Sequence, residues 1–474
     1  MPTNASEILR LLAAQGAMIE RLASDSRRCA PGVAFLAYPG EAADGRAHIG
    51  DAIRRGASAV LWEQAAFAWR EEWRVPNAPL AGLKQHAGEL AAELYGRPSE
   101  SLWMCGVTGT NGKTSCSQWI AAALSRKHIR SAVIGTLGYG IPGSLQPLPN
   151  TTPDALEIQA LLKKFVDEKH QAVAMEVSSH GLEQGRVNAI AFDCALFTNL
   201  SHDHLDYHGT MQAYAAAKEK LFDTAGLGAA VLNLDDAMGA RLALRLKGKG
   251  VRAIGYGFAD APAVAVDEYL PAKLLPPEHT QQVGRFNLAN ALGVLGCLLA
   301  FGVEKRQALA LIADLPPVPG RMQRVGDRPL VVVDYAHTPD ALEKVLQALR
   351  PVAQARRGRL AVLFGAGGDR DPTKRPLMGA VAARLADQVL VTSDNPRSED
   401  PMTIISQIEK GIDKPHQVEA DRARAIEQAI AQAASDDVVL IAGKGHEDYQ
   451  EIAGKRLPFS DALAAREALA RRTK

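Results

Sequence analysis

The last third of the chain alternates short apolar runs with longer segments that are typical of helices. The expected strands are 330–333, 360–364, 388–392 and 438–442, and the expected helices begin at Pro339, Arg375 and Met402. Strand–helix alternation of this kind predicts a mostly parallel sheet that is covered by helices on both faces.

Each of these apolar runs ends in polar or glycine-rich residues. The four endings are 334–337, 365–370, 394–397 and 443–447. In parallel sheets, ligands bind beyond the carboxyl ends of the strands. One polar ending is common in any loop, but four of them in one part of the chain predict a binding surface.

The preceding residues show the same alternation less regularly. An apolar run at Ala289–Val303 is too short for a membrane-spanning helix of ~20 residues, so it predicts a buried core helix that opens at Asn290. Further expected elements are a helix at 47–55 and strands at 33–38, 59–62, 102–107, 172–177, 194–200, 229–234 and 251–256.

Two breaks divide the chain into three blocks. One lies at Arg97-Pro98, and the other is the proline-rich segment 315–320, whose composition is typical of a stiff linker. A chain of 474 residues is long enough for several domains. We predict domains at 1–97, 98–320 and 321–474.

Composition and charge mainly exclude function classes. With 47% hydrophobic and 23% charged residues the chain is typical of a globular protein, and a formal net charge of +1 gives no reason to expect a nucleic-acid partner. The five cysteines are scattered without a Cys-x-x-Cys pair, which favours a reducing compartment and argues against a disulfide framework or a zinc site. The first residues lack a signal-peptide pattern. We therefore expect a cytoplasmic protein without membrane insertion.

The most informative motif is Gly-Thr-Asn-Gly-Lys-Thr at 109–114, between an expected strand and a helical segment at 115–124. Backbone amides and a helix N-terminus at such a turn bind phosphate. Lys113 would reach the β- and γ-phosphates, and the Thr114 hydroxyl would bind Mg²⁺. The common phosphate loop has a glycine where this chain has Val107, so the loop is a variant. The motif predicts a nucleoside triphosphate as ligand.

Two later segments offer metal ligands. Glu176 ends an expected strand, and a carboxylate there suits Mg²⁺, although taken alone it is more simply a solvated glutamate. His202, His204 and His208 suggest a transition metal, but zinc needs a fourth close ligand and none is near. One imidazole beside the oxygen ligands of a second Mg²⁺ fits this segment better.

Four motifs in order along the chain resemble those of the Mur ligases, the ATP-dependent amide-forming enzymes of peptidoglycan precursor synthesis. The motifs lie at 109–114, 150–154, 175–181 and 203–209. The resemblance covers nearly the whole chain. It implies an α/β fold of three domains: an N-terminal UDP-binding α/β domain, a central P-loop ATPase-like domain with a parallel sheet, and a C-terminal Rossmann-like domain.

Within the family, the chain most resembles the members that add meso-diaminopimelate rather than lysine. The segment 394–397, Asp-Asn-Pro-Arg, looks like their signature, and 25–35 resembles their uridine-binding start. Diaminopimelate carries a second carboxylate that lysine lacks, and a guanidinium such as that of Arg397 binds a carboxylate bidentately. The residues implied to contact diaminopimelate are Arg370, Asp394, Asn395, Pro396, Arg397, Gly443 and Glu447.

Other binding roles follow from the same resemblance. The implied contacts to the UDP-muramoyl-dipeptide are Ser24, Ser26, Glu41, Ala42, Ala43, Asn150, Thr151, Thr152, Ser178, Gln184 and Arg186. The implied contacts to ATP are Gly109, Thr110, Asn111, Gly112, Lys113, Thr114, Ser115, Asn287, Asn290, Arg321 and Asp334. Thr152 also reads as a helix N-cap followed by Pro153, so it has a competing structural role.

The resemblance also implies the catalytic groups. Taken alone, Lys218 is a solvated charge on a helix, but the resemblance implies a lysine carbamylated by CO₂, with Lys220 as the weaker candidate. The implied catalytic residues are Lys113, Glu176, His204 and Lys218, and the implied ligands of two Mg²⁺ are Thr114, Glu176, His204 and the Lys218 carbamate. The expected enzyme is an ADP-forming monomer that acts on small molecules.

Three alternatives remain open. One is a Mur ligase that adds lysine. Another is a folylpolyglutamate synthetase, whose motif shares Gly-Thr-Asn-Gly-Lys but typically continues Gly-Ser where this chain has Thr114-Ser115. The third is a nucleotide-gated regulator without catalysis, against which the four polar strand endings argue.

Overall fold

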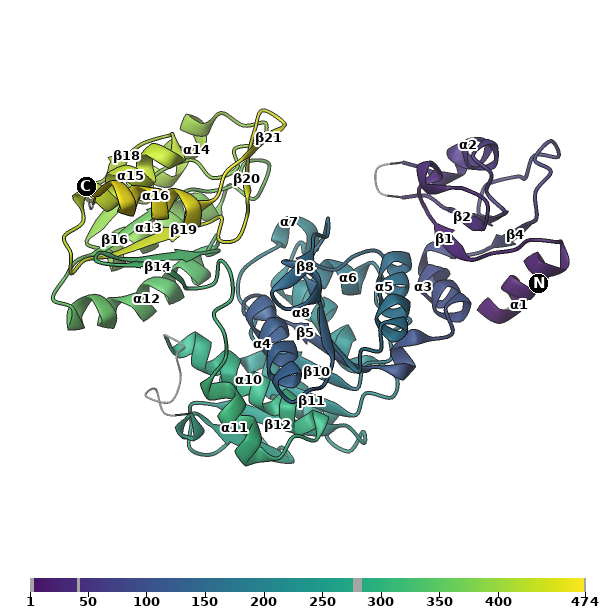
Figure 1. Cartoon of the computed structure of the whole chain (residues 1–474), viewed down its shortest axis with the longest axis horizontal. Helices are drawn as coiled ribbons and strands as arrows, with labels where there is room; N and C mark the ends of the chain where they lie inside the picture. Colours follow the sequence, from purple (N-terminus) through teal and green to yellow (C-terminus); the bar gives the residue numbers. More distant parts are fainter. Residues whose placement is uncertain (1–3, 41–42, 276–283, 473–474) are drawn as a thin grey trace. The chain divides into compact units, whose positions relative to one another are not determined.

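The computed structural model describes residues 4–40, 43–275 and 284–472. They form two compact units, whose elements are labelled in Figure 1. Unit 1 comprises 1–108, 124–196 and 217–230, and unit 2 comprises 109–123, 197–216 and 231–474. Among the helices of the described residues, none is both long and apolar enough to cross a membrane. The division into three domains stays a prediction.

Unit 1 begins with a parallel sheet in the order β1-β2-β3-β4. Its strands are β1 (Arg21–Ala23), β2 (Val33–Ala37), β3 (Ala59–Glu63) and β4 (Asn77–Leu80). Helices α1 (Ala5–Ala14) and α3 (Leu83–Leu94) contribute to one apolar core, and α2 (Ile49–Arg54) contributes to another. The expected strands are confirmed. The expected helix at 47–55 is shorter, because a 3-10 turn at Gly45–His48 precedes it.

The second sheet has nine strands in the order β13-β12-β11-β10-β5-β9-β6-β7-β8. They are β5 (Trp103–Thr108), β6 (Ser131–Gly135), β7 (Gly138–Ile141), β8 (Ser144–Gln146), β9 (Ala172–Glu176), β10 (Cys194–Phe197), β11 (Ala229–Asn233), β12 (Arg252–Gly257) and β13 (Glu268–Pro271). Strands β5, β9 and β6 are parallel, whereas β7 and β8 are added antiparallel. All five strands expected here are confirmed.

Eight α-helices of the described residues accompany this sheet in the sequence. They are α4 (Lys113–Arg126), α5 (Ala155–Asp167), α6 (Ser179–Glu183), α7 (Leu205–His208), α8 (Met211–Glu219), α9 (Ala237–Leu246), α10 (Arg285–Phe301) and α11 (Lys305–Ala313). The core helix α10 is confirmed, but the expected start at Asn290 is wrong. The helix begins at Arg285, because Gly284, with a φ of +97°, is the residue at which the chain turns into it.

The C-terminal part of unit 2 contains the regular alternation expected from the sequence. The strands are β14 (Gln323–Asp327), β15 (Leu330–Asp334), β16 (Leu360–Phe364), β17 (Gln388–Val391), β18 (Gln417–Val418) and β19 (Val438–Ala442). Their order is β14-β15-β19-β16-β17-β18, and every pairing except β14–β15 is parallel. The four strands with polar endings are therefore neighbours in the sheet.

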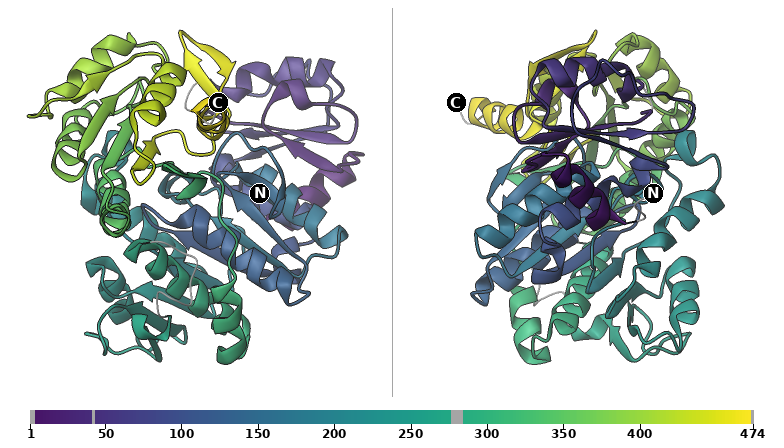
Figure 2. Two further views of the ribbon diagram at one scale, coloured as in Figure 1. Left: turned by 60° about the vertical axis from the view of Figure 1, so that its left-hand side comes forward. Right: turned by 90° about the vertical axis from the view of Figure 1, so that its right-hand side faces the viewer.

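Helices cover both faces of this sheet, as expected. One face carries α12 (Pro339–Ala355), α13 (Lys374–Leu385) and α14 (Pro401–Glu409), and the other carries α15 (Arg422–Gln432) and α16 (Asp461–Arg472). The hairpin of β20 (Tyr449–Ile452) and β21 (Lys455–Pro458) precedes α16, which is drawn in yellow in Figure 2.

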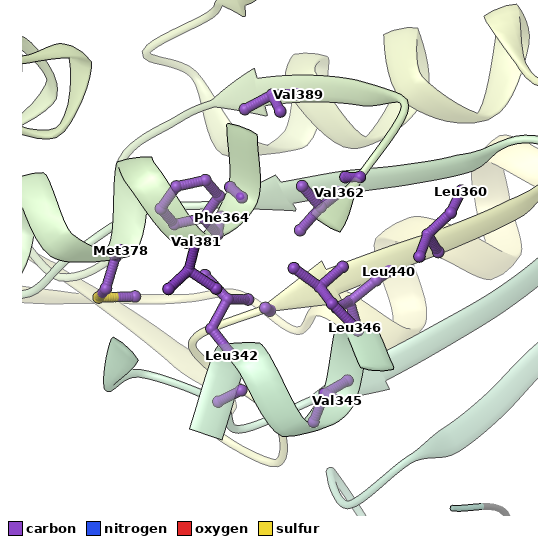
Figure 3. Close-up of a cluster of buried hydrophobic side chains, with 14 of the residues drawn as sticks. Leu342, Val345, Leu346, Leu360, Val362, Phe364, Met378, Val381, Val389 and Leu440 are labelled. Atoms are coloured by element: carbon purple, nitrogen blue, oxygen red, sulfur yellow. The ribbon is translucent and has the colours of Figure 1, made fainter. Parts of the chain in front are cut away.

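The core beneath α12 shows what fixes the strands in place. Leu342 and Leu346 of α12 pack in one buried cluster with Phe364 of β16 and Met378 of α13 (Figure 3). Each fully buried side chain of this size contributes ~1.5–3 kcal/mol. A rigid sheet of this kind holds the strand endings, where the polar loops lie, in a fixed arrangement.

Candidate active site

The loop after β5 requires glycine at two positions. Gly109 and Gly112 have φ of +148° and +88°. A Cβ on Gly109 would lie 1.9 Å from Oγ1 of Thr198, and a Cβ on Gly112 would lie 2.4 Å from Oδ1 of Asn290. The backbone therefore comes closer to its neighbours than any side chain would allow. Because α4 begins at Lys113, the helix N-terminus lies in the same loop, as a phosphate site requires.

A second loop, 198–201, is hydrogen-bonded to the phosphate loop. The backbone N–H of Thr110 donates to O of Asn199 (2.8 Å), and that of Asn111 donates to Oδ1 of Asn199 (3.1 Å). Ser201 N–H donates to Oγ1 of Thr110 (3.0 Å). The Asn199 contacts are absent from the sequence-based set. The sequence placed Asn199 within the expected strand 194–200, but β10 ends at Phe197 and Asn199 lies in the loop that follows.

The side chains that would meet a nucleotide are buried or engaged with the loop itself. Nζ of Lys113 donates to O of Gly109 and O of Thr110, both at 2.8 Å. Thr114 is buried, and its Oγ1 accepts from Nη2 of Arg321 (3.1 Å). Unit 2 thus brings Arg321 to the phosphate loop, and its role as a nucleotide contact stays a prediction.

Asp334 lies at the end of β15 and supports the same region. Its Oδ2 accepts from the N–H of Met322 (2.7 Å) and its Oδ1 from the N–H of Ala336 (2.8 Å). Burial raises the pKa of this carboxyl group, and the Arg321 guanidinium opposes that rise. Of the other predicted nucleotide contacts, Asn287 and Asn290 are buried on α10.

Asp340, on the first turn of α12, is a residue that the sequence analysis missed. Its Oδ2 accepts from Nδ2 of Asn111 (2.9 Å), Oγ of Ser201 (2.9 Å) and Nζ of Lys344 (2.8 Å). This single oxygen therefore joins the phosphate loop to the first helix of the C-terminal sheet.

Unit 1 gathers several of the predicted substrate contacts around Glu176. This side chain is buried at the end of β9, and its two oxygens accept from N–H of Thr136 (2.8 Å) and from Oγ1 of Thr136 (3.0 Å). The Thr136 hydroxyl lies 3.0 Å from Oγ1 of Thr151. A Cβ on Gly135 would be 2.2 Å from Oε1 of Glu176, so only glycine fits there.

Thr152 joins this group, but not as the expected helix cap. Asp154 is the N-cap of α5, since its side chain accepts from the first backbone amides of the helix. The Thr152 hydroxyl instead donates to O of Glu176 and accepts from N–H of Ser178, both at 3.0 Å. The N-cap prediction for Thr152 is therefore wrong, because the cap lies two residues later.

Arg186 completes the group in unit 1. Its Nη1 donates to O of Thr152 (2.6 Å), and its Nε donates to Oε1 of Gln184 (2.8 Å). Ser178 caps α6 by accepting from N–H of Gly181 (3.0 Å). Five predicted substrate contacts therefore lie together: Thr151, Thr152, Ser178, Gln184 and Arg186.

The remaining predicted substrate contacts are more scattered. Ser26 is buried in unit 1 and donates to Oδ2 of Asp51 (2.9 Å), whereas Ser24, Ala43 and Asn150 are exposed. Glu41 and Ala42 lie outside the described residues.

The two lysines weighed for carbamylation lie in different surroundings. The Lys218 residue is only 1% exposed on α8. Lys220 is exposed and its Nζ pairs with Oε2 of Glu183 (2.7 Å). Burial disfavours the charged form of an amine, and the neutral amine is the form that reacts with CO₂. Of the two lysines, Lys218 is therefore the one that is enclosed by the protein.

His204 is partly exposed and lies beside a charged cluster in unit 2. Its Nε2 is 3.4 Å from Oδ2 of Asp203, and its backbone has a φ of +54°. Burial alone would raise the pKa of Asp203, but His204, His337 and Lys374 lower it overall. Burial lowers the pKa of Lys374, against the opposing charges of nearby carboxylates. The sequence analysis missed Lys374, which follows the polar ending 365–370.

The loops after β16 and β17 interlock at the predicted amino-acid site. Nη1 of Arg397 donates to O of Gly368 (2.6 Å), and N–H of Gly368 donates to O of Asn395 (2.9 Å). A Cβ on Gly368 would be 1.9 Å from O of Pro396. Arg397, with a φ of +52°, is also bridged to Ile452 of β20. Arg370, on the same loop as Gly368, is exposed.

The ending of β19 adds the other predicted residues. A Cβ on Gly443 would lie 2.4 Å from Oδ2 of Asp394, which is buried. Nδ2 of Asn395 donates to Oε2 of Glu447 (2.8 Å). The structure therefore brings Asp394, Asn395, Arg397, Gly443 and Glu447 into one cluster of contacting loops.

A buried ion pair supports these loops from beneath. Arg422 and Asp461 have fully buried side chains, with Nε to Oδ1 at 2.7 Å and Nη2 to Oδ2 at 2.8 Å. The same guanidinium donates to O of Ser393 (3.1 Å) and O of Ala442 (2.9 Å). It thereby clamps the ends of β17 and β19.

These features define a nucleotide-binding α/β protein. It has a phosphate loop after β5 and a cluster of charged loops at the carboxyl ends of the strands in the C-terminal sheet. Three family models match along the chain: "Mur ligase family, catalytic domain" at 18–95, "Mur ligase middle domain" at 107–298, and "Mur ligase, glutamate ligase domain" at 320–445. The chain belongs to the Mur ligase family.

Relatives that match over nearly the full chain are named UDP-N-acetylmuramoyl-L-alanyl-D-glutamate–2,6-diaminopimelate ligase. The one from Pseudomonas syringae is 52% identical, with 96% of this chain and 95% of the relative covered. Those from Ectopseudomonas mendocina and Chromobacterium violaceum are both 50% identical, with coverage of 99% and 99%, and of 97% and 96%, respectively.

Solved structures agree with this fold. A structure titled as a UDP-N-acetylmuramoyl-L-alanyl-D-glutamate–2,6-diaminopimelate ligase has a TM-score of 0.66 and 35% identity, covering 96% of both chains. MurF from Thermotoga maritima in complex with ADP has a TM-score of 0.62 over 96% of this chain and 98% of its own. At 17% identity, the second likeness shows the fold alone.

Proposed function

We propose that the chain is an ADP-forming ligase that joins meso-2,6-diaminopimelate to the D-glutamate of UDP-N-acetylmuramoyl-L-alanyl-D-glutamate. The observation that carries this proposal is the cluster of Arg397, Asp394 and Glu447 at the strand ends of the C-terminal sheet, in a chain about half identical to relatives of that name. The reaction belongs to peptidoglycan precursor synthesis, and we place it in the cytoplasm. Five buried cysteine thiols favour a reducing compartment.

A free carboxylate does not form an amide at a useful rate, because its oxygen is a poor leaving group. In the proposed reaction, an oxygen of the D-glutamate carboxylate attacks the γ-phosphorus of ATP, and ADP leaves. The amine of diaminopimelate then attacks the carbonyl carbon of the acyl phosphate. The bond from carbon to the phosphate oxygen breaks, the amine loses a proton, and the products are the amide and inorganic phosphate.

In the first step, the phosphate loop would supply most of the stabilisation of the negative charge on the phosphates. Lys113, now bonded to carbonyls of its own loop, would turn to the phosphates, while the N-terminus of α4 offers backbone N–H groups. We propose Arg321, Asp334, Asn287 and Asn290 as further nucleotide contacts. Cationic side chains and backbone N–H groups placed around the phosphates stabilise the negative charge that develops on the transferred phosphoryl group.

The donor set for magnesium is chemically suitable. We propose four ligands for two Mg²⁺: the Thr114 hydroxyl, the Glu176 carboxylate, the His204 imidazole and a carbamate on Lys218. When bound, Mg²⁺ would offset the negative charge of the phosphates. Thr136 fixes the orientation of the Glu176 carboxylate through two hydrogen bonds.

The two substrates would be held by different loops. For the UDP-linked dipeptide we propose the group of Thr151, Thr152, Ser178, Gln184 and Arg186, together with Asn150 and the uridine contacts Ser24, Ser26 and 41–43. For diaminopimelate we propose Arg370, 394–397, Gly443 and Glu447. Arg397 would bind the second carboxylate, because a guanidinium fork matches its geometry. We expect the enzyme to act as a monomer.

A product assay tests this function. The purified chain is incubated with ATP, Mg²⁺, the UDP-muramoyl-dipeptide and either diaminopimelate or lysine, and the products are weighed by mass spectrometry. We expect a nucleotide-sugar tripeptide that contains diaminopimelate, and ADP release that needs both the dipeptide and the amino acid. A lysine product alone would favour the lysine-adding alternative. Steady ADP release with water alone would contradict a ligase.

Replacing Arg397 should separate amino-acid binding from nucleotide binding. We expect Arg397→Ala to raise the KM for diaminopimelate by at least about tenfold, because a bidentate charged contact is worth ~1.5–3 kcal/mol, and to leave the KM for ATP within about threefold. Steady-state kinetics with each substrate varied in turn measures both. The exposed Arg384 of α13, which pairs with Glu343 of α12, supplies the control Arg384→Ala. Equal rises in both KM values would count against carboxylate recognition by Arg397.

A further inference from the structure

We propose that Lys444 helps the enzyme to select an amino acid with a second carboxyl group over lysine, by holding Asn395 and Glu447 in place and by adding a buried positive charge beside them. This inference rests on the proposed function, since it concerns the same amino-acid site. Lys444 is not among the residues that the sequence indicated for this site. It follows Gly443 directly at the end of β19.

The Lys444 side chain is completely buried, yet it points its charge at the site. Its Nζ donates to Oδ1 of Asn395 (2.9 Å) and to Oε2 of Glu447 (3.0 Å). The ring centroid of Tyr449 lies 5.4 Å from the same Nζ. Burying an ammonium group costs free energy unless the group is paired. Here its partners are the amide oxygen of Asn395 and the carboxylate of Glu447, both of which we propose as substrate contacts.

These contacts fix the two partners in one orientation. Oδ1 of Asn395 also accepts from N–H of Glu451 (2.9 Å), so its Nδ2 must point away, and it donates to Oε2 of Glu447 (2.8 Å). Both donors to the Glu447 carboxylate thus reach the same oxygen. The other oxygen, Oε1, accepts no hydrogen bond within the part of the chain that the structure describes, which leaves it for a ligand.

The local charge balance depends on Lys444. Three carboxylates belong to this group of loops: Asp394, Glu447 and Glu451. Glu451 has two cationic neighbours, since its Oε2 lies 4.0 Å from Nε of Arg397 and 3.8 Å from Nε of Arg456, whereas Lys444 pairs with Glu447. The nearby guanidinium of Arg422 is already paired with Asp461. Without Lys444, Glu447 would lose the only ion pair that it makes among the described residues.

The two candidate amino acids respond differently to that balance. The distal end of diaminopimelate carries an ammonium and a carboxylate, whereas the distal end of lysine carries only an ammonium. A more negative site repels the extra carboxylate and attracts the ammonium that both share. Loss of the Lys444 charge should therefore penalise diaminopimelate more than lysine. A residue that only supported the loops would affect both substrates alike.

The test measures kcat/KM for diaminopimelate and for lysine with wild type, Lys444→Met and Lys444→Gln. Methionine is similar in length but uncharged, and glutamine is uncharged but keeps a hydrogen-bond donor. We expect kcat/KM for diaminopimelate, divided by kcat/KM for lysine, to fall by about tenfold or more in both variants. This change is equivalent to ~1.4 kcal/mol. The KM for ATP should stay within about twofold. The exposed Lys410, at the end of α14, supplies the control Lys410→Met, which should leave the ratio unchanged.

Two outcomes would overturn the inference. If both amino acids lose activity by the same factor, Lys444 is only a support. If Lys444→Gln keeps the wild-type ratio, the positive charge does not contribute to selection. Should Lys444→Met fail to fold, as judged by circular dichroism, the glutamine variant decides. A wild-type enzyme that forms no diaminopimelate product would instead refute the proposed function, and the two failures are thus distinguishable.

Discussion

Lys113→Met should lower kcat by at least about 10³-fold, equivalent to ~4 kcal/mol of barrier, while the chain stays folded. Lys113 is the first residue of α4, and its Nζ donates to two carbonyls of the loop that precedes the helix. Both carbonyls are neutral acceptors, so the loss of these two hydrogen bonds should lower the free energy of unfolding only slightly. The charge, by contrast, is needed when the γ-phosphoryl group moves, because no other side chain of the loop is cationic.

The measurement is a steady-state rate with saturating substrates, with nucleotide affinity followed by calorimetry. Thermal unfolding of the variant should begin within a few degrees of wild type. Lys113→Arg keeps the charge but changes its reach, and we expect it to recover little activity, since a guanidinium cannot occupy the space of a compact ammonium. A kcat for Lys113→Met within tenfold of wild type would remove Lys113 from the catalytic set.

The second large effect is expected for Lys218. Lys218→Ala should lower kcat by about 10²-fold or more, because a metal-ligand anion is removed, and short carboxylic acids such as acetate should restore part of the rate. The side chain is only 1% exposed, so alanine leaves a space in which a small acid can take the place of the carbamate. A ¹³C resonance from labelled bicarbonate, present in wild type and absent in the variant, would report the modification directly.

Lys220→Ala is the matched control, two residues along the chain. Its side chain is exposed and pairs with Glu183, so we expect its rate to stay within about twofold of wild type, as for other surface ion pairs. Equal losses in the two variants, or no recovery with any acid, would argue that Lys218 has a packing role and that no carbamate forms.

The sequence predicted the C-terminal sheet best because its strands are buried on both faces. Such strands appear as continuous apolar runs, and 360–364 and 438–442 matched the structure to the residue. Strands such as β7, with its two glycines, and β18, with two exposed residues, lack that signal and were not foreseen. Helix starts were predicted within one residue in the C-terminal sheet, where Pro339 begins α12 and Pro401 begins α14.

Site prediction depended on motifs and missed what the fold alone brings together. The phosphate loop and the ending 394–397 are contiguous in sequence, so their chemistry could be recognised there. Asp340 and Lys374 contribute through contacts with residues distant in the chain, such as Asn111 and Asp203. No local pattern marks them, because a single carboxylate or ammonium on a helix is usually solvated. The N-cap error at Thr152 has the same origin, since its hydroxyl bonds to backbone groups of Glu176 and Ser178, which are distant in the sequence.

The Arg422–Asp461 pair determines where the chain can be shortened. Asp461 begins α16, which lies beyond residue 445, where the match to the C-terminal family model ends. A fragment cut at that boundary would lose Glu447 from the amino-acid site and would also leave the Arg422 guanidinium in the interior without its counter-charge. Breaking a buried pair in this way costs ~3–5 kcal/mol. The final helix is therefore an essential part of any truncated version intended to bind the amino acid.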